Sequence, residues 1–177
     1  QLSLYNDSSL TLYFNEAMDS STSNKATNYI ANFSLGSPAS AIINTATFSS
    51  VQLTYPYPFT PGTRYTLSVS DNLKDCAGNN SKNASATFLL PQQAAENDIV
   101  INEVLFNPKE GGVDFVEVYN RSNKIIDLST IRLSNYDAIN NAPINMVNIS
   151  ATSYLFYPQQ YALLSTNGAL VQQHYYS

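Results

Sequence analysis

Hydrophobic and polar residues alternate along much of the chain with a period of two. A period of two is typical of a β-strand that buries one face, because successive side chains point to opposite sides. In the first half of the chain, three clear runs place apolar residues at Leu10, Leu12 and Phe14, at Val51, Leu53 and Tyr55, and at Tyr65, Leu67 and Val69. Weaker strand patterns occupy Leu2–Tyr5, Asn28–Ser34, Ala41–Thr47 and Ala84–Leu90.

Turn-forming residues separate these strands. The clearest turns contain Gly36, Pro61 with Gly62, and Gly78, because proline fixes φ and glycine allows a positive φ. A short helical turn is expected near Ser20–Ala26, with Asp19 or Ser20 as its cap. About seven short strands with turns between them predict an antiparallel β-sandwich in residues 1–90.

The pattern changes after residue 90. Residues 91–97 lack periodicity and large apolar side chains, so they are predicted to form an interdomain linker. Because Ile99, Val100 and Ile101 are apolar on both faces, the strand that follows is expected inside its sheet. Strand patterns in residues 98–177 occupy Ile99–Phe106, Val113–Asn120, Ile125–Leu128, Ile131–Leu133, Ile144–Ile149 and Gln160–Ser165. The predicted fold class is all-β, with two tandem β-sandwich domains.

Composition and charge exclude several classes of protein. Of 177 residues, 44% are hydrophobic and 12% are charged, and the net charge is −5, a balance that excludes intrinsic disorder. Lysine and arginine form no cluster, so nucleic acid is not expected as a partner. No apolar run is long enough to insert into a membrane. Cys76 is the single cysteine, which excludes an internal disulfide but not secretion.

Three motifs follow one another in the first half of the chain. They are Phe14-Asn-Glu-Ala-Met-Asp19, Pro61-Gly-Thr-Arg-Tyr65 and Asp75-Cys-Ala-Gly-Asn79. With these motifs, residues 1–90 resemble the bacterial Ig-like domain of surface-layer and other secreted bacterial proteins. The resemblance implies an Ig-like sandwich outside the cytoplasm. Within it, Asp75 and Asn79 are expected to bond nearby backbone amides.

A second set of motifs occupies the other half. It comprises Ile99-Val-Ile-Asn-Glu103, Phe115-Val-Glu-Val-Tyr-Asn120 and Ile126-Asp-Leu-Ser129. Residues 98–177 are thereby similar to the bacterial lamin tail domain, which implies a second Ig-like sandwich. That family has an aromatic residue in place of Ile131 and further strands beyond the position of Ser177. The domain is therefore expected to be incomplete, with an open sheet edge that favours self-association.

Two residues are weighed as catalytic groups. A catalytic histidine needs a nucleophile and an orienting acid within hydrogen-bond reach. The single histidine, His174, lies near the end of the chain, and no Gly-x-Ser-x-Gly motif is present. Cys76 has no second cysteine near it and only Lys74 as a cationic neighbour. We predict ordinary structural roles for both residues and no enzyme activity.

Acidic residues are weighed as metal ligands. Glu103 and Glu117 lie on strands among apolar neighbours, with Asp114 nearby, and such carboxylates need a partner or a metal. The Asp-x-Asp-x-Asp-Gly spacing of a calcium loop is absent. Because both glutamates belong to the lamin tail motifs, the resemblance implies that they bond backbone amides or basic side chains. A second, weaker candidate calcium site comprises Asp71, Asp75 and Asn79. We predict that no metal or cofactor binds.

Aromatic residues are concentrated near the C-terminus, at Tyr154, Phe156, Tyr157, Tyr161, Tyr175 and Tyr176. Exposed aromatic rings can stack on sugars or anchor a protein interface. The chain has no tryptophan, the residue that carbohydrate modules often use for stacking. We therefore expect these rings in the core or in contact with further strands.

The sequence favours a non-catalytic structural, adhesion or protein-interaction module pair of a larger secreted or cell-surface bacterial protein. Its expected partners are other domains of that protein, other surface proteins, or a second copy. One alternative is a pair of accessory domains of a secreted nuclease or phosphatase whose catalytic domain lies elsewhere. Another alternative is a carbohydrate-binding module.

Overall fold

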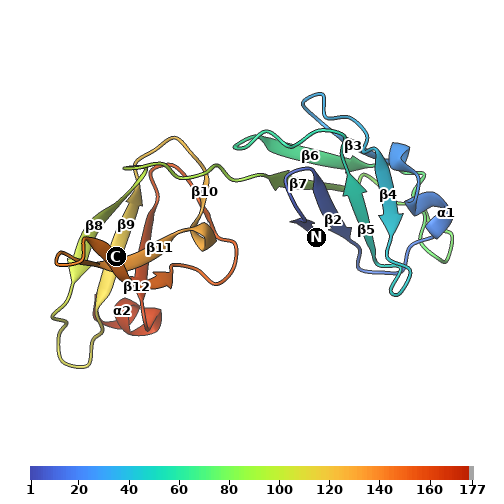
Figure 1. Ribbon diagram of the computed structural model, residues 1–177. Helices are drawn as coiled ribbons and strands as arrows, with labels where there is room; N and C mark the ends of the chain where they lie inside the picture. The colour runs from blue at the N-terminus through green and yellow to red at the C-terminus, as the bar shows by residue number, and fades with distance from the viewer. Residues whose placement is uncertain (176–177) are drawn as a thin grey trace. The chain divides into compact units, whose positions relative to one another are not determined.

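The computed structural model describes residues 1–175. The chain divides into two compact units, Gln1–Leu90 and a second unit that begins at Pro91 (Figure 1). Every strand pair within them is antiparallel, and the helices are short. The prediction of an all-β chain with two tandem sandwich domains is confirmed.

The first unit consists of two sheets. One sheet has four strands in the order β1 (Leu2–Leu4), β2 (Ser9–Tyr13), β5 (Ser50–Thr54) and β4 (Ser40–Ile43). The other has three strands in the order β3 (Tyr29–Ala31), β6 (Arg64–Val69) and β7 (Ser85–Leu89). Both sheets supply apolar side chains to a single core, as a β-sandwich requires.

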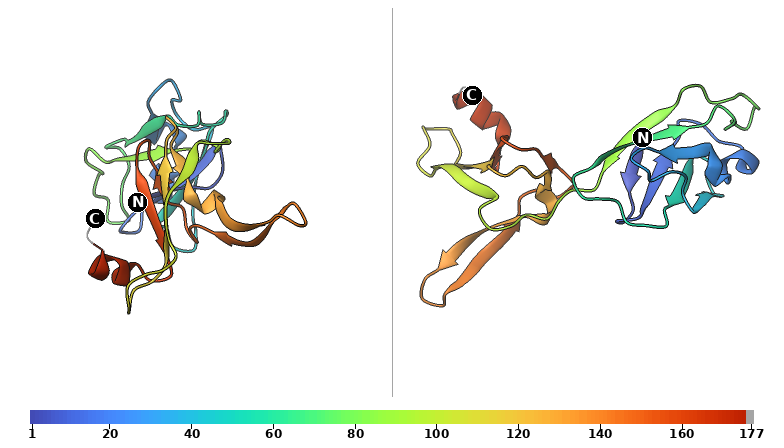
Figure 2. Two further views of the ribbon diagram at one scale, coloured as in Figure 1. Left: turned by 90° about the vertical axis from the view of Figure 1, so that its left-hand side faces the viewer. Right: turned by 90° about the horizontal axis from the view of Figure 1, so that it is seen from above.

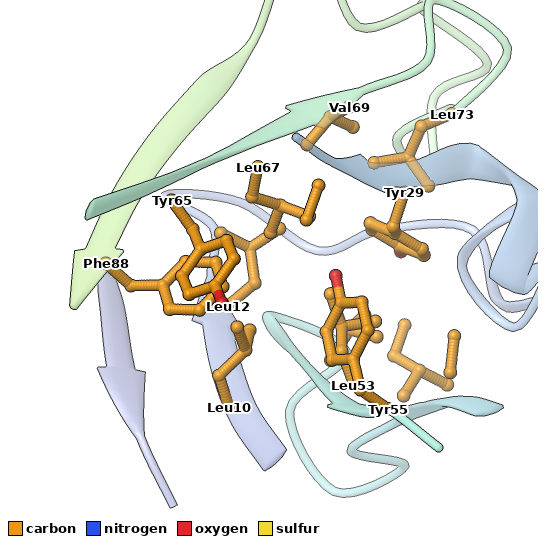
Figure 3. Packing of buried hydrophobic residues seen from close by; sticks show 14 of the residues in the cluster. Leu10, Leu12, Tyr29, Leu53, Tyr55, Tyr65, Leu67, Val69, Leu73 and Phe88 are labelled. Carbon is orange, nitrogen blue, oxygen red and sulfur yellow. The ribbon is translucent and has the colours of Figure 1, made fainter. Parts of the chain in front are cut away.

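The core of the first unit follows the predicted alternation. Leu10 of β2 and Leu53 of β5 are fully buried, and so is Leu67 of β6. Figure 3 shows these side chains converging between the sheets, beside the rings of Tyr65 and Phe88. The two rings are stacked, with their centroids 5.0 Å apart. Apolar positions with a period of two therefore mark the buried face correctly in this unit.

The expected turns also form in the first unit. Asp19 caps α1 (Ser20–Ser23), since its Oδ1 accepts the N–H of Thr22 at 2.9 Å. A 3₁₀ turn, Ala26–Asn28, follows α1. Gly62 and Gly78 adopt positive φ angles of 80° and 89°, as their turns require.

The second unit contains three small sheets. A three-stranded sheet has the order β14 (Tyr161–Ser165), β9 (Phe115–Asn120) and β8 (Ile99–Leu105). The pairs β10 (Ile126–Asp127) with β13 (Leu155–Phe156), and β11 (Arg132–Asp137) with β12 (Ala142–Asn148), make the other two. A 3₁₀ turn, Leu128–Thr130, joins β10 to β11. The buried centre of this unit contains Val118, Leu128 and Phe156.

One strand prediction is wrong. Strand β8 was expected inside its sheet, but it lies at the edge and pairs with β9 alone within residues 1–175. Ile101 is 59% exposed and Val104 is 49% exposed. Periodicity reports which faces of a strand carry apolar side chains, and it carries no information on how many strands lie alongside. The apolar residues of β8 therefore lie on an exposed edge.

Two further features of the second unit differ from the sequence pattern. The segment predicted as a linker contacts this unit, because the N–H of Gln92 donates to the carbonyl of Ile125 at 2.7 Å. Close by, Lys124 forms an ion pair with Asp98 at 2.6 Å. Helix α2 (Gly168–His174) was not predicted from the sequence, and its N-cap is Asn167.

Candidate interaction surface

Within the described residues, neither of the two residues weighed for catalysis has the hydrogen-bonded partners that catalysis requires. His174 is the last residue of α2, and within residues 1–175 its ring makes no hydrogen bond to a hydroxyl or carboxylate. Cys76 is an exposed free cysteine in the turn before Gly78. Its backbone N–H donates to the carbonyl of Ala17 at 3.0 Å, which docks the turn against the N-terminal motif.

The residues of the weaker calcium candidate do not share one site: Asp75 and Asp71 accept hydrogen bonds from different parts of the chain. Asp75 accepts the backbone N–H of Asn79 at 2.8 Å and its side-chain amide at 2.7 Å. These bonds from Asn79 hold the pKa of Asp75 below its ordinary value. Asp71 instead accepts the N–H of Asn83 at 3.0 Å. The expected bonding of Asp75 to backbone amides is confirmed, and its carboxylate oxygens hold the turn around Gly78.

Two polar residues of the lamin tail motifs hold the second unit together. The side-chain amide of Asn120 is fully buried and donates to the carbonyls of Lys124 and Phe156 at 2.9 and 3.0 Å. Asp127 accepts the N–H groups of Ser129 and Tyr154 at 2.9 and 3.0 Å. These bonds satisfy buried polar groups, which explains why amide and carboxylate side chains are needed here.

Glu103 and Glu117 lie directly opposite each other on β8 and β9. Glu117 accepts the side-chain amide of Asn102 at 2.7 Å, across an irregularity in the register between Ile101 and Glu103. The expected bonds to backbone amides or basic side chains are therefore not what forms here. Within residues 1–175, neither glutamate makes an ion pair, and no three acidic, histidine or cysteine side chains gather around a metal position.

Glu103 and the exposed apolar residues Ile101 and Val104 of β8 lie on opposite faces of the sheet. Ile101 lies opposite Val118, and Val104 lies opposite Val116. Val118 is in the buried centre of the unit, and Val116 packs against it. Directly opposed residues share a face, so Ile101 and Val104 extend the core face of the sheet beyond its covered part.

An apolar cleft of about 550 Å³ adjoins this uncovered face. Val104, Val116 and Leu164 of the three-stranded sheet line one side of it. Leu133 and Val147, from the β11–β12 hairpin, line the other. Figure 2 shows this hairpin, in orange, extending away from the rest of the second unit. The cleft therefore lies where the hairpin and the sheet diverge.

The hairpin itself exposes apolar side chains on both strands. Tyr136, Met146 and Val147 are each more than half exposed, and Ile139 in its turn is almost fully exposed. Exposed apolar side chains gathered on one element are typical of an interaction site in soluble proteins. The cleft, the β8 edge and the hairpin together form what we call the open face of the second unit.

The aromatic residues near the C-terminus do not share one role. Phe156 is fully buried in the core, whereas Tyr154 and Tyr161 are more than half exposed. The ring of Tyr161 packs against that of Tyr119 of β9, with the ring planes tilted by 30° and the centroids 4.6 Å apart. The hydroxyl of Tyr175 accepts the N–H of Lys109 at 3.0 Å. Tyr157 is partly buried, and Tyr176 lies outside the described residues.

The resemblance to the lamin tail domain led us to expect an open sheet edge in this unit, but the sequence did not identify the residues that form the open face. Its residues belong to ordinary strand patterns, in which an exposed valine is indistinguishable from a buried one. The only available signal was the run Ile99-Val-Ile101, which is apolar on both faces, and it was interpreted as a buried strand. The apolar residues of the β11–β12 hairpin gave no signal of their own.

The fold and this surface define a class of protein: an all-β chain of two Ig-like sandwiches, with an open apolar face on the second. Residues 3–89 match the bacterial Ig-like domain family, and residues 92–176 match the lamin tail domain family. The chain therefore consists of a bacterial Ig-like domain followed by a lamin tail domain. Both resemblances predicted from the sequence motifs are confirmed.

A comparison with solved structures matched structures of a surface-layer protein. A crystal structure of the S-layer protein rSbsC(31-844) is 10% identical, with a TM-score of 0.45, and the match covers 93% of this chain and 31% of that one. The N-terminal part of the bacterial S-layer protein SbsC is 16% identical, also with a TM-score of 0.45 and 93% of this chain covered, against 42% of that one. This chain thus spans less than half of either structure. No curated protein matches the sequence.

Membrane insertion through a helix has no support in the described part of the chain. No helix there has the length and apolar character needed to cross a bilayer.

Proposed function

We propose that this chain is a non-catalytic structural and protein-interaction module pair of a larger secreted or cell-surface bacterial protein. The observation that carries the proposal is the open face of the lamin tail domain. There, an edge strand, a cleft of about 550 Å³ and a projecting hairpin present apolar side chains to solvent. Burying such surface against a partner is favourable, at roughly 25 cal/mol per Å² of apolar area.

The Ig-like domain supports a spacer role in this proposal. Its two sheets enclose one core. The loop around Gly78 is held to the Phe14–Asp19 motif by a hydrogen bond from the backbone N–H of Cys76 to the carbonyl of Ala17. Ser23 and Tyr29 are both buried, and the Tyr29 hydroxyl donates to the Ser23 carbonyl at 3.0 Å. A sandwich held together in this way is suited to a spacer role.

Sedimentation velocity of the 177-residue chain tests the interaction role. Without its partner, the open face should cause weak self-association that increases with protein concentration. The association should be stronger in about 0.5 M salt than in about 0.05 M salt, because salt screens the repulsion between acidic copies. A strictly monomeric chain at every concentration and salt level would contradict the proposal.

A matched pair of variants locates the contact. Ile101→Thr removes apolar surface from the β8 edge and should weaken the self-association. Ile42→Thr removes a similarly exposed isoleucine from β4, an edge strand of the Ig-like domain, and should leave it unchanged. Equal effects of the two substitutions would show that the contact does not involve the open face.

A further inference from the structure

We infer that the β8 edge of the lamin tail domain receives an extended strand of a different protein, with apolar side chains toward the cleft and a lysine or arginine beside Glu103. The inference rests on the proposed interaction role and adds the chemistry of the partner. Three independent features of the described chain support it: an unpaired backbone edge, an uncovered apolar face, and two carboxylates without a cation.

The backbone of β8 is available for pairing. The strand is seven residues long, and within residues 1–175 it has β9 as its only neighbour. The outer edge of such a strand presents N–H and C=O groups that a further strand can bond. The register irregularity at Asn102 increases the local twist, so we expect pairing to be continuous on either side of it.

The core face of β8 sets the apolar half of the partner's pattern. Ile101 and Val104 lie on this face, with 59% and 49% of their surfaces exposed. A strand added beside β8 would place every second side chain on the same face as Ile101 and Val104. These side chains would point toward the cleft lined by Val116 and Val147. Apolar side chains at those positions would extend the core by one strand.

The opposite face of β8 sets the charged half of the pattern. Glu103 lies directly opposite Glu117, and like charges in this position repel each other. On an added strand, the residue opposite Glu103 would lie on the same face of the sheet, in line with Glu103 and Glu117. A lysine or arginine there would be attracted to both carboxylates. A second copy of β8 would instead bring another Glu103 to the same small surface, which keeps self-association weak and favours a partner strand that carries a cation.

Two blocked heptapeptides serve as probes of this inference: Thr-Val-Lys-Val-Lys-Val-Thr and its counterpart with glutamate in place of lysine. Each is titrated into the uniformly labelled 177-residue chain and followed by NMR chemical shifts. The lysine peptide should shift the amide signals of β8 and bind about threefold or more tightly than the glutamate peptide. Glu103→Lys should reverse the preference, and Glu103→Gln should reduce it.

Two controls decide between the possible outcomes. Ile101→Thr should weaken binding of the lysine peptide, whereas Ile42→Thr on the Ig-like domain should leave it unchanged. Equal binding of both peptides at β8 would overturn the charged half of the inference and leave the proposed interaction role standing. Absence of shifts at β8 with either peptide would overturn the inference as a whole. The salt-dependent self-association separately decides the proposed function.

Discussion

Glu103 and Glu117 lie directly opposite each other on the adjacent antiparallel strands β8 and β9. The amide of Asn102 donates to Glu117, and within residues 1–175 neither carboxylate has a cation as partner. Opposed like charges destabilise a strand pair, so this arrangement is unfavourable in the isolated domain. A cation on an added strand would relieve the repulsion, which supports a docking role for this edge.

Removing one of these charges should stabilise the chain. Glu103→Gln is expected to raise the free energy of unfolding of the lamin tail domain by about 0.5 kcal/mol at low salt. The gain should decrease as salt screens the repulsion. Urea unfolding followed by NMR signals of the domain measures it. Glu110→Gln, in the loop between β8 and β9, is the control and should have no effect, while a loss of stability in Glu103→Gln would contradict the interpretation.

Two buried tyrosines should respond oppositely to loss of their hydroxyl groups. The Tyr29 hydroxyl donates to the Ser23 carbonyl at 3.0 Å, whereas the buried Tyr55 hydroxyl has no hydrogen-bond partner among the described residues. Burial raises the pKa of Tyr55 to about 12, so its phenol is neutral at ordinary pH. Tyr29→Phe should cost about 1 kcal/mol, and Tyr55→Phe should be neutral or stabilising by up to about 1 kcal/mol. Thermal unfolding of the two variants compares them, and an equal loss in both would refute the distinction.

Among the carboxylates of the lamin tail domain, Asp127 is expected to contribute most to the free energy of unfolding. Its oxygens accept the N–H groups of Ser129 and Tyr154 and the hydroxyl of Ser153, the last at 2.6 Å. Asp127→Ala leaves these partly buried donors without an acceptor and should cost about 2 kcal/mol in urea unfolding. Asp114→Ala is the matched control, because Asp114 is exposed and the described residues give its carboxylate no hydrogen bond. Equal costs for the two variants would contradict this role.

The same carboxylate predicts acid sensitivity. Burial acts to raise the pKa of Asp127, but the hydrogen bonds from Ser153, Ser129 and Tyr154 outweigh it, so the pKa lies below the ordinary 3.8. A depressed pKa stabilises the folded state above pH 3.8, and this stabilisation is lost as the pH falls through the lowered value. Stability should therefore fall between about pH 5 and about pH 2, and less steeply in Asp127→Asn. Parallel pH profiles of the two proteins would disprove the assignment.

Gly78 tests the contribution of backbone conformation alone. Its φ is +89°, and a Cβ atom added there would meet no atom within 4 Å. Gly78→Ala should therefore cost about 1 kcal/mol from backbone strain and nothing from crowding. Gly168→Ala, at the start of α2, is equally open and has no positive φ, so it should be neutral or slightly stabilising. Thermal unfolding distinguishes the two substitutions, and equal effects would mean that conformation at Gly78 is unimportant.

The sequence was sufficient for the Ig-like domain because its strands bury one face each. Leu10, Leu53 and Leu67 alternate with polar residues, and all three are fully buried. The sequence also located the turn around Gly78, and it gave Asp19 as one of two candidate caps for α1. These features depend on neighbours close in sequence, and local patterns report such neighbours well.

An open sheet edge was expected, but the residues that form the open face could not be predicted, because they depend on contacts that strand patterns do not encode. Whether Ile101 is buried is decided by the strand or layer beside it, and the same three-residue apolar run fits an inner strand and an exposed edge. Opposition of Glu103 to Glu117 depends on a register that shifts by one residue at Asn102. A register shift of this kind arises from the pairing of two distant segments and has no marker in either one.

The most direct test of the central claim is a search for intermolecular nuclear Overhauser effects between the lysine heptapeptide and the labelled chain. Contacts from peptide backbone protons to β8, together with contacts from peptide valines to Ile101 and Val104, are the expected result. They would show an added strand whose apolar face covers the core face of the sheet. Peptide contacts confined to the Ig-like domain or to the outer face around Tyr161, with none at β8, would contradict the account.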